Sequence, residues 1–120
     1  MSIQNSDSAL DESDESLAEL LTLTCEVGAD GTIIYRNSEG QPHRIHGPAV
    51  IYNDRKLAWY SNGQIHRADG PAVIFPDGYR AWYSNGRRHR VGGPAVIHPN
   101  GDELWFEDGI CVKRISKGDQ

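Results

Sequence analysis

Histidine is the residue of this chain with the clearest capacity for chemistry, because imidazole binds metal ions and transfers protons near neutral pH. Three of the five histidines, His43, His66 and His89, recur at intervals of 23 residues, each followed by an arginine. If each interval contributes two strands to a sheet, equivalent histidines lie about 9.5–10 Å apart. A zinc ion needs all its ligands within about 2.3 Å, so these residues cannot share one. The pattern predicts a structural role, in which each histidine caps or hydrogen-bonds the loop after an Asn-Gly pair.

Other enzyme chemistry has no support in the sequence. His46 and His98 are not repeated and would need nearby carboxylates to form a catalytic site. There is no nucleophile elbow, phosphate-binding glycine loop or zinc-binding helix motif. Cys25 and Cys111 do not form a CxxC pair, and without a signal-peptide pattern we expect reduced thiols. The chain is therefore expected to be no enzyme and to need no metal or cofactor.

Aromatic residues and arginines recur with the same period and could form a binding surface, since Trp, Tyr and Arg dominate protein-binding hot spots. The expected partner face consists of Trp59, Tyr60, Arg67, Trp82, Tyr83, Arg87, Arg88, Arg90 and Trp105. Neighbouring Trp and Tyr residues of one strand point to opposite faces of a sheet. A single sheet cannot leave both faces wet without exposing a large apolar patch. Sheet curvature, a helix, a second copy of the chain or a partner must therefore cover one face.

The elements that would position these residues are periodic. The run GPAVI from Gly47 recurs letter for letter from Gly70 and Gly93, and WYSNG from Trp59 recurs from Trp82. A fixed period of this length is typical of stacked units that bury apolar residues on one another. Short β-branched and aromatic runs between Asn-Gly, Asp-Gly and Gly-Pro predict strands and tight turns. We favour two strands per unit, at about 79–83 and 94–98 in one copy, because an even number restores the chain direction. A three-strand meander is the alternative.

These residues resemble the MORN repeat, a 23-residue β-hairpin repeat. The resemblance rests on the period and on YSNGRRHR…GPAVIHPNG, from Tyr83 to Gly101, with the copy before it. It extends, with degenerate copies, from Asp30 to Arg114. His-Arg replaces the usual His-Gly and two segments differ by two residues, so the chain looks like a variant of a kind found in bacterial and phage proteins. The resemblance implies an elongated antiparallel sheet with a binding role, and it carries over no catalytic residue.

The 120 residues divide into four segments by composition. Residues 1–15 form an acidic tail expected to be disordered, and 16–28 form a capping helix and lead-in. Residues 29–115 form the β-repeat domain, with three clear units and degenerate ends, and 116–120 form a C-terminal tail. Ser16 and Glu19 have capping-box spacing, and leucines share one face, which predicts a helix over about 16–23. The helix would cap the first unit or enter a partner groove.

Charge is distributed unevenly along the chain. Residues 1–35 hold eight acids and no Lys or Arg, whereas residues 36–120 carry +3. The acidic N-terminal arm, with Asp11, Glu12, Asp14 and Glu15, could meet a basic partner surface. The net charge of −5 and the pI near 5.4 speak against nucleic acid and against a membrane surface. Nucleic-acid or anionic-lipid binding through the row of arginines is nevertheless the alternative function.

The sequence thus predicts a mainly β protein: an elongated single antiparallel sheet of stacked 23-residue hairpins, with a short N-terminal helix after an acidic tail. We expect a non-catalytic protein–protein interaction module. Size and resemblance favour a small phage or bacterial inhibitor, or an antitoxin-like protein, that binds and regulates a larger protein. Its expected place is the cytoplasm, or the host cytoplasm if it is phage-encoded. A homodimer through a sheet face or edge is also compatible with the sequence.

Overall fold

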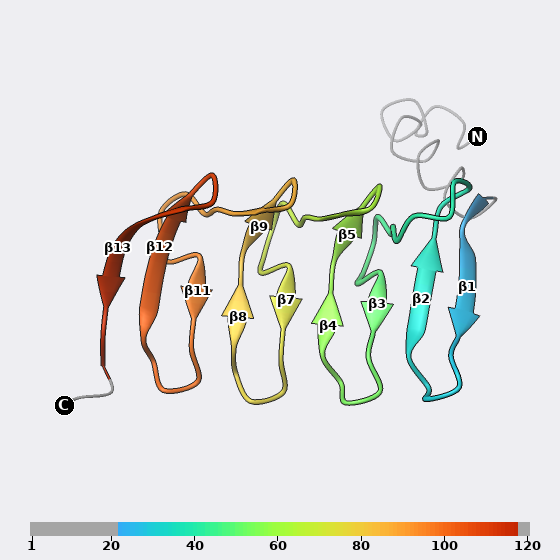
Figure 1. Cartoon of the computed structure of the whole chain (residues 1–120), viewed down its shortest axis with the longest axis horizontal. Coiled ribbons are helices and arrows are strands. Elements are labelled where there is room, and N and C mark those ends of the chain that lie inside the picture. The colour runs from blue at the N-terminus through green and yellow to red at the C-terminus, as the bar shows by residue number, and fades with distance from the viewer. Residues whose placement is uncertain (1–21, 118–120) are drawn as a thin grey trace, which may run out of the picture.

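The computed structural model describes residues 22–117, which form strands joined by turns. Nine strands of this part lie side by side in one antiparallel sheet (Figure 1). Their order along the row is β1 (Thr24–Val27), β2 (Ile33–Arg36), β3 (Val50–Ile51), β4 (Leu57–Ala58), β7 (Val73–Ile74), β8 (Arg80–Ala81), β11 (Val96–Ile97), β12 (Glu103–Glu107) and β13 (Ile110–Ile115). The prediction of a mainly β protein with one large antiparallel sheet is confirmed.

Each of the 23-residue units 47–69, 70–92 and 93–115 places one hairpin in this sheet: β3–β4, β7–β8 and β11–β12. In the first two units two strands therefore enter the sheet, as favoured from the sequence. The Asn-Gly pairs form further short hairpins outside it, β5 (Tyr60–Ser61) with β6 (Gln64–Ile65), and β9 (Tyr83–Ser84) with β10 (Arg87–Arg88). In the last unit, β13 instead stays in the sheet beside β12. Each of the first two units is thus a sheet hairpin followed by an Asn-Gly hairpin.

The strands are shorter than predicted because the chain leaves the sheet at each tryptophan of the first two units. In the expected strand 79–83, β8 ends at Ala81 and β9 begins at Tyr83. Between them, the Trp82 N–H donates to the Ala95 carbonyl at 2.7 Å, in the next unit. The Trp82 carbonyl accepts from the His89 N–H at 3.1 Å, in its own Asn-Gly hairpin. Trp82 therefore divides its backbone hydrogen bonds between the sheet and the hairpin.

The turns that join β1 to β2, β3 to β4, β7 to β8 and β11 to β12 lie along the same side of the sheet (bottom of Figure 1) and share one hydrogen-bond pattern. In each turn a short polar side chain accepts a hydrogen bond from the backbone N–H two residues later, at 2.9–3.1 Å; these residues are Asp30, Asp54, Asp77 and Asn100. The next residue has positive φ and is glycine in three turns. In the turn between β3 and β4 it is Arg55, with φ of 76°. An L side chain in this region is strained by about 1–2 kcal/mol.

The buried apolar residues among those described are small: Ala49, Val50, Ala58, Ala72, Ala81, Ala95 and Val96. Paired residues of antiparallel strands share a face. One face therefore carries the row Ile34, Val50, Ala58, Val73, Ala81, Val96 and Leu104. Tyr52 and Tyr60 pack against this row. No helix and no second large sheet within residues 22–117 covers either face, so the large side chains stay half-buried.

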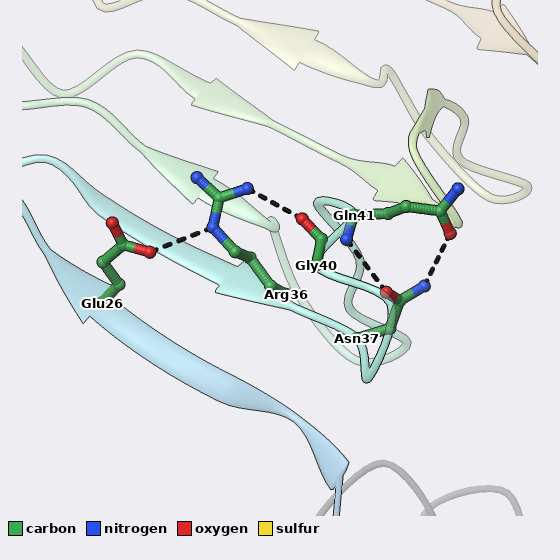
Figure 2. Close-up of polar contacts among 5 residues, drawn as sticks. All are labelled: Glu26, Arg36, Asn37, Gly40 and Gln41. Carbon is green, nitrogen blue, oxygen red and sulfur yellow. Dashed lines mark hydrogen bonds and ion pairs between the residues drawn. The ribbon is translucent and has the colours of Figure 1, made fainter.

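In the degenerate copy before unit 47–69, a polar network around residues 36–41 takes the place of the Asn-Gly hairpin (Figure 2). Asn37 Oδ1 accepts from the Gln41 N–H at 3.0 Å, and Asn37 Nδ2 donates to Gln41 Oε1 at 2.9 Å. Arg36 Nε pairs with Glu26 Oε1 at 3.0 Å, and its Nη1 donates to the Gly40 carbonyl at 2.9 Å. The network joins β1, β2 and the following loop at the N-terminal end of the described sheet.

The helix predicted over 16–23 is not supported. Only its last two positions, Thr22 and Leu23, are described, and from residue 23 to residue 117 there is no helix. β1 already begins at Thr24, inside the segment 16–28 that was expected to be helix and lead-in. The acidic tail over 1–15 and residues 118–120 lie outside the described residues. Within residues 22–117 no helix is long and apolar enough to span a membrane.

We expect Arg55→Gly to raise the free energy of unfolding by about 1 kcal/mol, because it relieves the positive φ of an L residue. Gly78→Ala is the matched control in the next unit. Gly78 has φ of 103°, and an added Cβ would meet no atom within 4 Å, so its loss of stability reports on the backbone alone. Urea unfolding measures the free energy of unfolding of both variants and of the wild type. A less stable Arg55→Gly protein would contradict the turn geometry.

Candidate binding groove

Three hollows of about 740, 640 and 360 Å³ follow one another along the stacked units. Residues 66–69 line both the first and the second hollow, and residues 89–91 line both the second and the third. Neighbouring hollows therefore adjoin one another across shared walls, and we call the row of three hollows the repeat groove. Its lining consists of residues 43–47, 59–62, 66–71, 82–84, 89–93, 105–108 and 112.

A stacked pair of cation and aromatic ring recurs in every copy. The guanidinium carbon of Arg67 lies 3.9 Å from the centroid of Trp59. The same distance separates Arg44 from Tyr35 and Arg90 from Trp82, and in the last unit Lys113 Nζ lies 4.7 Å from Trp105. Arg67 Nη1 also donates to the Pro71 carbonyl of the next unit at 3.0 Å, and the arginines before and after it do the same. These Arg–aromatic stacks hold the tryptophans of the groove in place.

The glycine of each Gly-Pro pair leaves room for this guanidinium. A Cβ added to Gly70 would lie 2.9 Å from Arg67 Cζ, and one added to Gly93 would lie 2.8 Å from Arg90 Cζ. Carbon atoms at these distances overlap, so an alanine would displace the guanidinium. Gly70 does not have positive φ. A glycine is therefore needed here because the guanidinium lies too close for a Cβ, and not because of the backbone conformation. This explains why Arg-x-x-Gly-Pro recurs as a unit.

The repeated histidines have a structural role, but they bond to the turn of the following unit, whereas the sequence predicted a bond to the loop after an Asn-Gly pair. His43, His66 and His89 each accept a hydrogen bond at Nδ1 from a backbone N–H of the following unit's turn, at 2.9, 3.0 and 3.1 Å. For His66 the donor is Asn85, the first residue of an Asn-Gly pair. Because Nδ1 accepts, the neutral ring carries its proton on Nε2. His66 and His89 each line two neighbouring hollows.

Most of the predicted partner-face residues come together in the groove. Trp59, Tyr60 and Arg67 line the first hollow, Arg67, Trp82, Tyr83 and Arg90 the second, and Arg90 and Trp105 the third. The structure thus gathers seven of the nine along one row of adjoining hollows.

Arg87 and Arg88 are the two that do not line the groove, and both are exposed. Arg88 Nε donates to Tyr83 Oη at 3.2 Å, and its guanidinium carbon lies 5.3 Å from the Phe106 centroid. The hydrogen bond to Tyr83 raises the pKa of Arg88. The acidic-arm residues Asp11, Glu12, Asp14 and Glu15 lie outside the described residues.

Sequence reasoning missed the aliphatic residues of the groove. Val91 is 87% exposed and lines the second and third hollows, whereas Ile45 is 40% exposed and lines the first. Val112, 54% exposed, lines the third hollow. The signal was present, because an aliphatic residue follows each His-Arg pair, with Ala68 in the middle copy. An apolar loop residue that folding leaves exposed is available to a partner.

The groove has no net formal charge. Its three arginines are balanced by Asp69, Glu107 and Asp108. Arg67 Nε pairs with Asp69 Oδ1 at 3.2 Å, and the Arg67 side chain is 25% exposed. Within residues 22–117, no group of three or more His, Cys, Asp or Glu residues could hold a metal ion. The groove therefore combines aromatic and aliphatic side chains with charged groups whose formal charges sum to zero.

Comparisons with known proteins add no assignment to this surface. No protein-family model matches the sequence, and neither the curated proteins nor the solved structures give a match.

Two tyrosines have pKa values raised by burial. Burial is the main cause for Tyr60, and the nearby Tyr52 and Tyr83 act in the same direction. Burial also raises the pKa of Tyr79, partly opposed by Arg88. A folded-state pKa above the unfolded value means that the fold favours the neutral phenol. These tyrosines therefore contribute stability that is complete below pH of about 10 and is lost as the pH rises further.

We expect Gly70→Ala to lower the free energy of unfolding by about 1–2 kcal/mol, because it moves Arg67 off Trp59 and away from the Pro71 carbonyl. In an Arg67→Ala background the added methyl group has room, and the same change should be neutral or stabilising by about 0.5 kcal/mol. Chemical denaturation of the four proteins gives this double-mutant cycle. Equal effects in both backgrounds would show that the glycine serves another purpose.

We expect stability to fall between pH 9 and pH 11, with a shallower fall for Tyr60→Phe, which removes one phenol with a raised pKa. Urea unfolding across this range provides the measurement. Tyr35→Phe is the matched control. If Tyr60→Phe retained the full pH dependence, burial of Tyr60 would not contribute to it.

Proposed function

We propose that the chain is a non-catalytic protein-binding module that holds its partner in the repeat groove. The observation that carries this proposal is the exposure of Ile45, Val91 and Val112 along the repeat groove, beside half-buried tryptophans. Ile45 and Val91 lie in loops and Val112 lies in the edge strand β13, and the part of each side chain that stays in water gains nothing from folding. A partner that covers the groove would bury them together with the aromatic rings, which are residue types typical of binding hot spots.

The periodic architecture supports the same function. Units of 23 residues that each place one hairpin in a long sheet agree with the resemblance to MORN repeats, for which a binding role is expected. In this proposal the partner is a larger cytoplasmic protein that the chain inhibits or regulates. The acidic arm, with Asp11, Glu12, Asp14 and Glu15, would then meet a basic surface of that partner.

The arginine row supports a protein partner over a phosphate-bearing one. Arg44, Arg67 and Arg90 stack on rings and donate to backbone carbonyls, so they are already engaged within the fold. Binders of nucleic acid use a basic groove that follows the phosphates. The repeat groove is neutral, which disfavours nucleic acid and anionic lipid as the ligand.

Affinity capture from the source cells with wild-type protein, Val91→Asp and Ile110→Asp tests this function. Both residues are exposed aliphatics, at 87% and 68%, but only Val91 lines the groove. We expect wild type and Ile110→Asp to retain the same protein, and Val91→Asp to retain about fivefold less. Retention should survive a rise in salt from 0.1 to about 0.5 M, which would release a phosphate-dependent ligand.

Two results would contradict the proposal. Equal capture by Val91→Asp and wild type would show that the groove does not hold the partner. Recovery of nucleic acid or lipid, lost at high salt, would favour the alternative function through the arginines. Circular dichroism of both variants checks that the fold is unchanged.

A further inference from the structure

The repeat groove has a fixed period. Equivalent residues of successive units lie two strands apart, because β3–β4, β7–β8 and β11–β12 follow one another in the sheet. Neighbouring strands are about 4.7–4.9 Å apart, so equivalent hollows recur about every 9.4–9.8 Å. Three hollows therefore span two steps, or about 19 Å in all. A ligand that uses all three in the same way must repeat at this distance.

A polyproline II helix has this repeat. It has three residues per turn and a rise of about 3.1 Å, so every third side chain points the same way at intervals of about 9.3 Å. Over two steps the mismatch with the groove is at most about 1 Å. In an extended strand, side chains three residues apart point to opposite faces. In an α-helix, residues seven apart recur at about 10.5 Å, and the mismatch over two steps grows to about 1.5–2 Å.

We propose that the repeat groove binds an uncharged, proline-rich segment of a partner protein in the polyproline II conformation. One side chain of each residue triplet would enter each hollow. This inference rests on the proposed function and names the chemistry of the partner. Aromatic-lined grooves are a known means of recognising this preformed, low-entropy conformation. The absence of net charge in the groove suits an uncharged segment.

The histidines offer hydrogen-bond donors for the carbonyls of such a segment. A polyproline II segment makes no internal hydrogen bonds, so its carbonyls need donors. His66 and His89 line the boundaries between neighbouring hollows, and their Nδ1 atoms are occupied by backbone N–H groups. Their Nε2–H groups remain as donors at the same period as the hollows. Each triplet of the segment would thus place one side chain in a hollow and one carbonyl near a histidine.

The segment must come from another protein. All six prolines of the chain lie between Pro42 and Pro99, where they belong to the three repeat units or to the degenerate copy before them. Residues 1–21 contain no proline and carry six acids. The N-terminal arm therefore lacks both the composition and the neutrality that the groove favours.

The test is an NMR titration of the full chain with two blocked 12-residue peptides. The probe has the sequence (Pro-Pro-Leu)₄, and the control has (Pro-Pro-Pro-Leu)₃. Both form polyproline II helices, but leucines recur at about 9.3 Å in the probe and at about 12.4 Å in the control. We expect the probe to bind about tenfold more tightly and to shift the indole N–H signals of Trp59, Trp82 and Trp105. Val91→Asp should weaken probe binding about fivefold, and Ile110→Asp should leave it unchanged.

Equal affinity for the two peptides, or no binding of the probe, would overturn the inference. Displacement of the probe by a peptide of residues 1–21 at stoichiometric concentration would show that the acidic arm is the occupant, and would overturn it as well. Either result leaves the proposed function standing if capture of the cellular partner still depends on Val91. Loss of both probe binding and Val91-dependent capture would remove the proposed function too.

Discussion

The interaction on which the rest of the structure depends is a guanidinium that lies over an aromatic ring and reaches the carbonyl of the next unit's proline. Arg67 makes both contacts, to Trp59 and to Pro71. The buried residues of the sheet are only alanines and valines, so the core alone does not fix the larger side chains. The stack does so, and the hydrogen bonds from Arg67 to the Pro71 carbonyl and from the Asn85 N–H to His66 tie each unit to its neighbour. The stack also holds the rings that line the groove.

The repeat allowed much of this to be predicted from the sequence. Identical letters 23 residues apart indicate identical surroundings, which gave the two-strand unit and the structural role of His66. The same reasoning brought Trp59 and Arg67 into one surface. Periodicity is informative here because a stacked unit contacts mainly its neighbours, so that one solution serves every copy.

For the remaining features, residue type alone does not determine the hydrogen-bond partners or the exposure of a side chain. Trp82 was expected inside a strand, and nothing in its type shows that its two backbone groups bond to different hairpins. Arg67 was assigned to a partner face, but the sequence does not distinguish an exposed guanidinium from one stacked within the fold. Val91 is aliphatic like a core residue, and its exposure follows from the loop conformation alone. The helix over 16–23 followed from local spacing, which carries no information on tertiary packing.

Identical junctions between units make the number of copies an evolutionary variable. A tandem duplication of 69 nucleotides would insert one more unit whose arginine, glycine and histidine already fit both neighbours. Such a protein would gain one hollow without any new contact having to arise by mutation. Selection could thus adjust the length of ligand that is recognised in discrete steps of one unit.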